Sequence, residues 1–379
     1  MHIFFISGIP ADNSGTGRFV QTLAKQSRNC KDVTISILYN THKNKNLLNE
    51  VLHFQDVIDA DHVVLLHPQT LGFRWCIEFL LRRKKRTWIY ILDASFFCIR
   101  SYNHVPGEFS ACLRCLDGKF GWALRLQCPV FPIHQEDAIA FLVFLKKKVQ
   151  ASQVALFAQN FSYKKLLHIH FGDNAIVRTV GMWAADFDDL LAQTNREKNQ
   201  ESPAPSFDIV FHGNAHPAKG TVWTNVLARF MAKRSFLFPF LKGFDKMAYM
   251  PQENTYFSNM NWSSGLANQI SRSPITLCPS LWSAPIEGAL VKSIFTGNLV
   301  GVVQESTSFS NEISENIIMK LPQDPENAAA MINEIFQRNI SLDNNAKSDW
   351  IKQFITQNKN VLKKIITEIS LAETYIPQK

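Results

Sequence analysis

The sequence alternates between short apolar segments and longer segments of helical periodicity, and it does so in two successive runs. Strands that are joined through a helix are parallel, and their crossover connections are right-handed. Each run therefore predicts an α/β domain with a doubly wound parallel sheet. The expected strands are IFFISG, VTISILYN, HVVLLHP, WIYILD, VALFA and AIVRTVG in the first run, and FDIVFHG, SPITLCPS and NLVGVV in the second.

A polar segment at residues 192–206, AQTNREKNQESPAPS, separates the two runs. It is rich in Glu, Asn, Ser and Pro and has few side chains that a core could bury, which is typical of a linker. The 379 residues also exceed what a single core usually sustains. We expect a first domain at residues 1–191, a second at residues 207–340, and amphipathic helices at residues 341–379 that cross back to the first domain.

The composition favours a protein without a membrane span, because no apolar stretch reaches the length of a transmembrane helix. The first residues, MHIFFISGIP, lack the basic region of a secretory signal and are interpreted as a strand. We therefore expect a cytoplasmic protein. In that reducing environment the 7 cysteines are thiols or metal ligands rather than disulfides.

A basic cluster, RRKKR at Arg82 to Arg86, closes an expected helix with large apolar side chains. One interpretation is peripheral contact with the inner face of a membrane, where each cation near anionic lipid contributes about 1 kcal/mol. The other is a buried helix whose last turn carries cations that complement its dipole. Nucleic-acid binding is not expected, because the sequence has no aromatic RNA-binding motif, zinc-finger histidine pair or long basic stripe.

The segment CPSLWSAPIEGALVKS, residues 278–293, joins an expected strand to an expected helix and carries the charges of Glu287 and Lys292. In open α/β sheets ligands bind at the carboxyl ends of strands, where the first N–H groups of a helix attract an anion such as a diphosphate. Glu287 and the backbone of Ile286 and Gly288 are therefore candidate ligand contacts.

Two more loops follow expected strands. Glycines at Gly15 and Gly17, on either side of Thr16, would let the backbone approach a ligand, although taken alone they are better explained by an ordinary turn between a strand and a helix. The second-run loop HGNAHPAKG contains Lys219, which could offset charge on a leaving phosphate; the alternative is a solvated lysine. The other candidate contacts of this loop are Gly213, Asn214 and Gly220.

Taken in order, the first glycine loop, VGMWAADFDDL, HGNAHPAKG and CPSLWSAPIEGALVKSIFTGNLVGVV resemble the GT-B-fold "group 1" glycosyltransferases. That family mostly uses nucleotide sugars and retains the anomeric configuration. The resemblance implies two Rossmann-like domains that face a cleft. It also implies a hexosyltransferase-like enzyme that transfers a sugar to a glycan, lipid-linked saccharide or protein acceptor in surface polysaccharide or glycoconjugate biosynthesis, without a catalytic metal.

The resemblance also implies roles for particular residues. Lys219 would stabilise the leaving phosphate, Glu287 would hold the donor, and Asp93 would face the acceptor and the reacting carbon. No protein nucleophile is needed if the acceptor attacks from the same face with the leaving phosphate as base. The implied donor-binding set is Gly15, Thr16, Gly17, Gly213, Asn214, Gly220, Ile286, Gly288 and Lys292.

The sequence departs from the family pattern at the site. Leu92 precedes Asp93 at the position where many members of the family have His. Asn214 occupies the position of a family Arg. Ala284 and Lys292 replace the two expected glutamates.

Lys292 would either form an ion pair with Glu287 or favour a donor with extra negative charge, such as a uronic acid or a nucleoside monophosphate sugar. Two alternative functions are a degenerate binding protein and a Rossmann-type oxidoreductase. The oxidoreductase is disfavoured by an incomplete dinucleotide fingerprint. His67 is either a further cleft residue or a packed histidine at a strand end.

Four cysteines gather in an insertion at residues 93–132 of the first domain. Thiolates spaced around a CLRC pair are typical of a structural zinc site, in which His104 could replace one ligand. Some bacterial members of the family carry a cysteine-bearing insertion here. Unligated thiols and an iron–sulfur cluster are the alternatives. The predicted zinc ligands are Cys98, Cys112, Cys115 and Cys128.

Overall fold

The computed structural model describes residues 1–30, 33–39, 54–129, 135–194, 207–241, 251–338 and 343–374. The chain divides into two compact units. Unit 1 comprises Met1–Tyr102, Leu113–Asp186 and Thr356–Lys379, and unit 2 comprises Asn103–Cys112 and Phe187–Ile355. Most of the expected linker, residues 195–206, lies outside the described residues, whereas its first three residues end a helix.

Unit 1 is built on a parallel six-stranded sheet in the order β2-β1-β3-β4-β5-β6. All six strands expected in the first run are present. The central strands β3 and β5 are buried along their whole length, as expected for a parallel sheet covered on both faces. The strands are β1 (His2–Ser7), β2 (Thr34–Tyr39), β3 (His62–Leu66), β4 (Thr87–Tyr90), β5 (Val154–Ala158) and β6 (Val177–Thr179).

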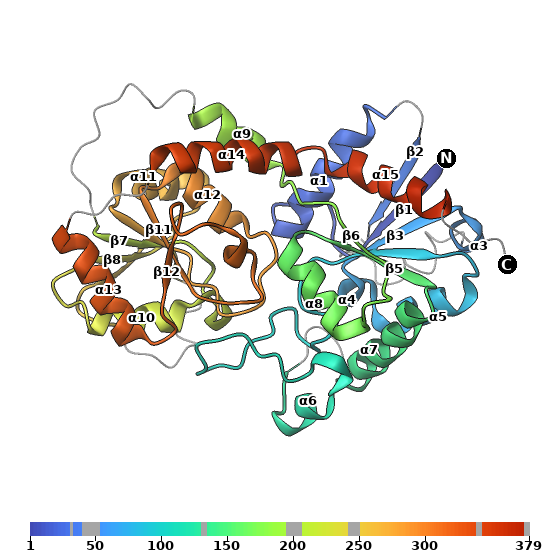
Figure 1. Ribbon diagram of the computed structural model, residues 1–379, viewed down its shortest axis with the longest axis horizontal. Coiled ribbons are helices and arrows are strands. Elements are labelled where there is room, and N and C mark those ends of the chain that lie inside the picture. Colours follow the sequence, from blue (N-terminus) through green and yellow to red (C-terminus); the bar gives the residue numbers. More distant parts are fainter. Residues whose placement is uncertain are drawn as a thin grey trace. The chain divides into compact units, whose positions relative to one another are not determined.

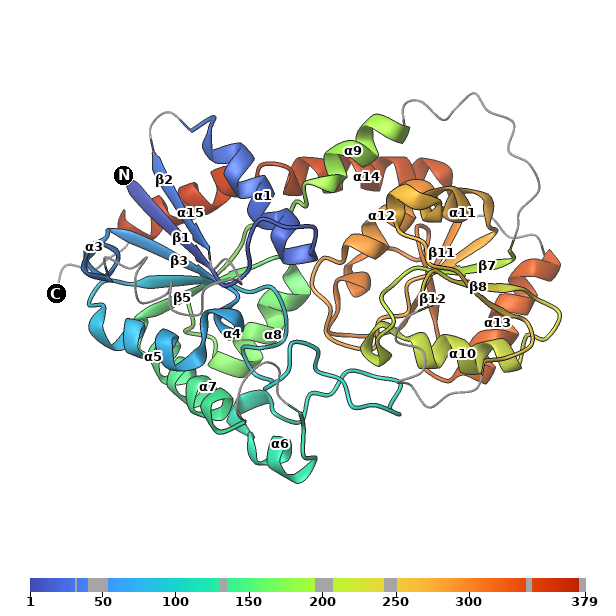
Figure 2. The ribbon, with the colours of Figure 1, turned by 180° about the vertical axis from the view of Figure 1, so that it is seen from behind.

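Helices cover both faces of this sheet (Figure 1). Two of them, α1 and α15, pack together on one face, and α5, α7 and α8 lie on the other, as the view from behind also shows (Figure 2). The helices of unit 1 are α1 (Gly15–Ser27), α3 (Phe54–Asp59), α4 (Pro68–Leu71), α5 (Phe73–Arg82), α6 (Gly121–Arg125), α7 (Gln135–Gln150), α8 (Phe161–Phe171) and α15 (Val361–Thr374).

The C-terminal segment is tied into unit 1 by side-chain bonds. Gln26 of α1 donates to the carbonyl of Lys359 over 2.5 Å and accepts from the N–H of Leu362 over 3.1 Å. Asn358 Oδ1 accepts a bond of 3.1 Å from the N–H of Met182. The C-terminal helix therefore completes the core of unit 1 rather than forming a separate appendage.

Unit 2 repeats the architecture, with a parallel six-stranded sheet in the order β12-β11-β10-β7-β8-β9. The three strands expected in the second run are β7, β10 and β11, and the other three were not expected. The strands are β7 (Ile209–Phe211), β8 (Phe236–Phe238), β9 (Thr255–Phe257), β10 (Ile275–Leu277), β11 (Leu299–Val303) and β12 (Met319–Leu321).

The helices of unit 2 form two layers, with α11 and α12 on one face of the sheet and α10 and α13 on the other (Figure 1). Two more helices, α9 and α14, contain unit boundaries. The helices are α9 (Asp186–Thr194), α10 (Thr221–Arg229), α11 (Leu266–Arg272), α12 (Gly288–Thr296), α13 (Pro325–Arg338) and α14 (Asn344–Asn358).

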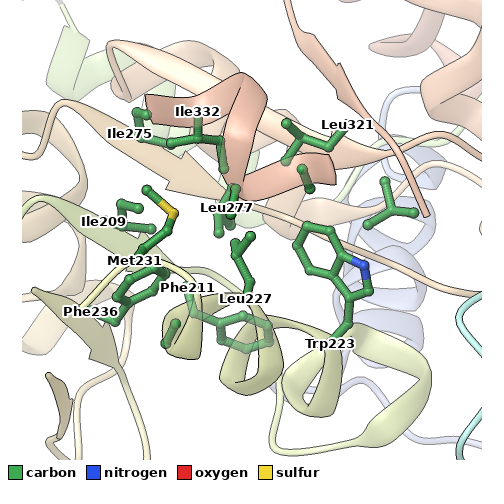
Figure 3. Close-up of a cluster of buried hydrophobic side chains, with 14 of the residues drawn as sticks. Ile209, Phe211, Trp223, Leu227, Met231, Phe236, Ile275, Leu277, Leu321 and Ile332 are labelled. Atoms are coloured by element: carbon green, nitrogen blue, oxygen red, sulfur yellow. The ribbon is translucent and has the colours of Figure 1, made fainter. Parts of the chain in front are cut away.

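A hydrophobic cluster fills the space between the sheet of unit 2 and helices α10 and α13 (Figure 3). Trp223 is fully buried in it, and its indole N–H donates to the carbonyl of Gln323 over 2.7 Å, so the ring adds apolar area without an unsatisfied donor. This packed face holds β7 and β10 in register, and the loops that follow these two strands carry the candidate site.

The basic cluster at the end of α5 is used largely inside the protein. Arg83 is buried and donates to the carbonyls of Ile58 over 2.6 Å and Asp61 over 3.0 Å. Burial lowers the pKa of Arg83 to about 10. Arg82 pairs with Glu78, Lys85 with Asp61, and Arg86 bonds to the carbonyl of Ser152. These contacts favour the interpretation in which the cluster closes a buried helix. Within the described residues, no helix is long and apolar enough to cross a membrane.

Candidate functional site

The first part of the site is the turn between β10 and α12 in unit 2. Its backbone continues from the sheet, with the Cys278 N–H bonded to the carbonyl of Gly301 over 2.8 Å. Glu287 is the N-cap residue of α12, but its side chain does not bond to the helix N–H groups. The N-terminus of α12 therefore lies at the carboxyl edge of a parallel sheet, in the position where such folds bind anions.

Lys219 reaches this helix N-terminus from the loop after β7. Its ammonium forms an ion pair with Glu287 and lies 4.7 Å from the centroid of the Trp282 ring. The side chains of Lys219 and Glu287 are only 15% and 10% exposed. The sequence predicts both residues as site residues, and the structure brings them together.

Gly220 allows the two loops to approach each other. It has φ = 79°, and a Cβ at this position would lie 2.1 Å from the carbonyl oxygen of Pro279. Next to it, the Leu281 N–H bonds to the carbonyl of Ala218 over 2.8 Å. Only glycine combines that left-handed backbone with so close an approach. Gly220 therefore positions Lys219 through the backbone.

The ion pair that the structure gives Glu287 is with Lys219, whereas the sequence suggested Lys292 as one possible partner. Lys292 is buried on α12, and its ammonium lies 5.1 Å from the centroid of the Trp262 ring. The ring of His212, at the end of β7, stacks on the same indole with a centroid distance of 5.4 Å. The indole thus contacts a cation and a second aromatic ring.

Burial lowers the pKa of His212 to about 3, with a further contribution from the charge of Lys292, so this imidazole is neutral at physiological pH. Its Nδ1 lies 2.8 Å from Ser293 Oγ, which also accepts a bond from Cys278 Sγ. Burial raises the pKa of the Cys278 thiol to about 12. The protonated thiol is therefore the favoured form of Cys278 at neutral pH.

The other predicted contacts of unit 2 are backbone positions or packed side chains. Ile286 is buried, and a Cβ on Gly288 would be in ordinary contact with Phe187. The carbonyl of Asn214 accepts a bond from Thr221 Oγ1 over 3.3 Å. A small pocket lies beside this turn, and Ala284 lines it together with Glu287 and Ser308.

The second part of the site lies in unit 1, where β3 and β4 end side by side. His67 Nε2 is 3.3 Å from Asp93 Oδ2, and both side chains are 11% exposed. The other ring nitrogen, Nδ1, lies 2.8 Å from Thr70 Oγ1. His67 has φ = 56°, an uncommon backbone conformation for a side chain of this size, of the kind that is often found at functional sites.

Asp93 is held as a carboxylate. Burial alone would raise its pKa, but bonds and charge from His67 and two bonds from Ser95 hold the pKa below its usual value. Ser95 donates from its N–H over 2.9 Å and from its hydroxyl over 2.5 Å, both to Oδ1. An imidazole thus lies beside Asp93, and it comes from the loop that follows the neighbouring strand β3.

The glycine loop of unit 1 is built around Asp12 and Ser14. Ser14 Oγ caps α1 by accepting a bond of 3.0 Å from the Gly17 N–H, and a Cβ at Gly17 would lie 2.0 Å from Asp12 Oδ1. The capping bond occupies the Gly17 N–H. Gly15 has open space beside it, and Thr16 follows it in the first turn of α1.

The four cysteines of the insertion give no support to the predicted zinc site. All four are described, but no group of three or more metal-binding side chains among the described residues could hold a metal ion. Part of the insertion, Asn103–Cys112, belongs to unit 2, whereas the other three cysteines belong to unit 1. His104, the proposed substitute ligand, has Nε2 2.9 Å from the carbonyl of Glu108.

Hydrogen bonds dock this part of the insertion on unit 2. Asn103 is fully buried, donates to Ser283 Oγ over 2.9 Å and accepts from the Ser283 N–H over 3.0 Å. Glu305 Oε2 accepts a bond of 2.9 Å from the Ala111 N–H. Amide and carboxylate bonds therefore fix the segment beside the α12 turn.

Comparison with known structures supports the fold class. HepE from Anabaena, in complex with UDP-glucose, matches with a TM-score of 0.58 at 10% identity over 99% of this chain and 100% of that one. Sucrose-phosphate synthase from Thermosynechococcus elongatus matches with a TM-score of 0.57 at 11% identity, over 99% of this chain and 98% of that one. The UDP-GlcNAc 2-epimerase of Neisseria meningitidis matches with a TM-score of 0.51 at 12% identity, over 98% of this chain and 100% of that one.

These similarities establish the GT-B fold that the sequence predicted. They do not fix the reaction, since one of the three structures is an epimerase. Neither the protein-family models nor the curated proteins contain a match to the sequence.

Proposed function

We propose that the protein is a glycosyltransferase that binds a nucleotide-activated sugar on unit 2. The observation that carries the proposal is the position of Lys219. Its ammonium is held against the N-terminus of α12 by Glu287 and by the face of Trp282. A diphosphate bound there would interact with a cation, a helix dipole and free N–H groups at once.

In this proposal Lys219 neutralises the charge that develops on the leaving phosphate. Glu287 orients Lys219 in the free protein and accepts bonds from donor hydroxyls when the diphosphate takes over the ammonium. Lys292, whose ammonium lies against the Trp262 ring, favours a donor that carries additional negative charge. UDP-sugars are the first donors to test, because HepE was crystallised with UDP and with UDP-glucose.

We assign the acceptor to the carboxyl edge of the unit 1 sheet, where Asp93 and His67 form a buried pair. The acceptor classes are a glycan, a lipid-linked saccharide or a protein, in surface polysaccharide or glycoconjugate synthesis. Retention of the anomeric configuration belongs to the proposal, and same-face attack with the leaving phosphate as base would achieve it without a protein nucleophile.

The test is a screen of sugar nucleotides, beginning with UDP-sugars, for thermal stabilisation, followed by measurement of nucleotide release from each donor that binds. A ligand at a hundredfold excess over its dissociation constant adds about 2.7 kcal/mol to stability, which a thermal shift detects. We expect stabilisation by at least one UDP-sugar, and stronger stabilisation by UDP-glucuronate than by UDP-glucose. No stabilisation by any sugar nucleotide, of UDP or of another base, would refute the proposal.

A second candidate function is sugar-nucleotide binding without transfer. It is favoured by Ala284, which is buried in the pocket wall where the family pattern has a carboxylate. Binding without UDP release in the presence of any acceptor would support this second function over the first.

A further inference from the structure

The excess of positive charge is confined to unit 1. The segments of unit 1 contain 26 Lys and Arg against 15 Asp and Glu, whereas those of unit 2 contain 14 against 17. The net charge of +8 is therefore the sum of +11 on unit 1 and −3 on unit 2. A charge asymmetry of this size would attract an anionic partner to unit 1 rather than to unit 2.

Helix α6 of unit 1 and the residue that follows it expose several large apolar side chains close together. Trp122, Leu124 and Leu126 are 39%, 55% and 38% exposed, although they lie within five consecutive residues. In both views of the ribbon α6 projects from the lower end of unit 1, away from the sheet (Figure 1 and Figure 2). We call these three side chains the α6 tip.

The α6 tip is held in place by buried neighbours. Ala123 is 1% exposed, and its N–H bonds to the carbonyl of Phe120 over 3.0 Å. The Ala123 carbonyl accepts bonds from the Cys128 N–H over 3.0 Å and from Gln135 Nε2 over 3.2 Å. The tip is therefore a fixed projection of the fold, and its exposure is not a consequence of a frayed end.

Two exposed cations flank the α6 tip. The guanidinium of Arg125 lies 5.2 Å from the centroid of the Trp122 ring, and Lys119 precedes α6. Within the described residues neither cation forms an ion pair with a carboxylate. In the basic cluster at the end of α5, by contrast, Arg83 is buried and Arg82 and Lys85 are paired. The free cations of unit 1 thus include two beside the apolar tip.

We propose that the α6 tip docks unit 1 on an anionic lipid bilayer, with its three apolar side chains in the interface and Arg125 and Lys119 on the lipid phosphates. Tryptophan and leucine beside cations are the residues that bind membrane interfaces. The charge of unit 1 attracts such a surface over a longer range and orients the protein on it. Docking does not depend on the donor site.

Co-sedimentation of the full-length protein with vesicles tests the proposal. We expect binding to vesicles that contain phosphatidylglycerol, weak binding to phosphatidylcholine alone, and loss of binding at high salt. Leu124→Ser should weaken binding, whereas Leu241→Ser, at a 57% exposed leucine of unit 2, should leave it unchanged. Arg125→Gln should weaken binding roughly fivefold, and Arg229→Gln in unit 2 should have no effect.

Failure of the wild-type protein to bind anionic vesicles would overturn the proposal. So would equal binding by Leu124→Ser and Leu241→Ser, because the α6 tip would then not enter the lipid. Arg125→Gln keeps every apolar side chain and provides the test if Leu124→Ser alters folding. Competition by a DNA duplex that is insensitive to Leu124→Ser would indicate a general polyanion site and also count against docking. Vesicle binding without nucleotide binding would refute the proposed function alone.

Discussion

Replacement of His212 by Phe should flatten the acid dependence of the stability of unit 2. The pKa of His212 is about 3 in the folded protein and about 6.5 in the unfolded chain, so the unfolded state binds more protons below pH 6.5. The stability that the depressed pKa of His212 contributes is therefore fully present above pH 6.5, and it is lost as the pH falls below that value. Between pH 7 and pH 5 the loss from this one group is about 2 kcal/mol.

Phe keeps the aromatic contact with Trp262 and removes the titrating group, at the cost of the bond to Ser293. Losing that bond costs about 1 kcal/mol of stability at every pH. This cost cancels when the stability of the variant at one pH is subtracted from its stability at another. His170, whose pKa burial lowers to about 4, titrates in both proteins and cancels as well.

The assay is urea unfolding of the wild type and of His212→Phe at pH 7 and pH 5, with the midpoint and slope of each transition compared. The wild type should lose about 2 kcal/mol more than the variant between the two pH values. Equal losses would show that His212 is protonated in the folded protein or that its pKa is not depressed. Either result would contradict the buried position of His212 against Trp262 and beside Lys292.

Three further perturbations test other parts of the structure. Gly220→Ala, whose Cβ would lie 2.1 Å from the Pro279 carbonyl oxygen, should destabilise unit 2 by more than 1 kcal/mol and weaken nucleotide binding, as a melting curve and a titration would show. Arg83→Met should cost about 2 to 4 kcal/mol in urea unfolding, whereas the neighbouring exposed Lys84→Met should cost less than about 0.5. Asp93→Asn should reduce the loss of stability on acidification below about pH 4, because the depressed pKa of Asp93 stabilises the fold above its unfolded value. Unchanged acid titration would contradict its pairing with His67.

The fold could be predicted well from the sequence because apolar alternation between strands and helices leaves few arrangements. All nine expected strands are present. Length does not separate the unexpected strands from the expected ones, because β8, β9 and β12 have three residues each, as do β6, β7 and β10. β8 lies in SFLFPF, whose apolar run is compatible with several structures.

The site was only partly predictable, because its contacts join residues distant in sequence. Glu287 lies five positions from Lys292 and 68 from Lys219, yet it pairs with Lys219. A sequence shows which residues can reach each other along one helix, but not which loop arrives from the adjacent strand. The pairing of His67 with Asp93 did have a signal, since both follow strands that are neighbours in a parallel sheet.

The predicted zinc site shows the limit of ligand spacing as an argument. The CLRC pair has a spacing that zinc ligands use, but the route of the chain decides whether the other two thiols arrive. Here Asn103 and Glu305 hold the middle of the insertion on unit 2. That route is set by buried polar contacts, which composition and spacing do not reveal.

The most direct test of the central claim is calorimetric titration of UDP into the wild type, Lys219→Met and Lys352→Met. Met retains much of the apolar stem of lysine, and Lys352 is an exposed lysine of the same unit. We predict that Lys219→Met weakens UDP binding about 10-fold to 100-fold, as expected for loss of a charged hydrogen bond, and that Lys352→Met has no effect. Equal affinity of all three proteins for UDP would contradict a donor site at the β10–α12 turn.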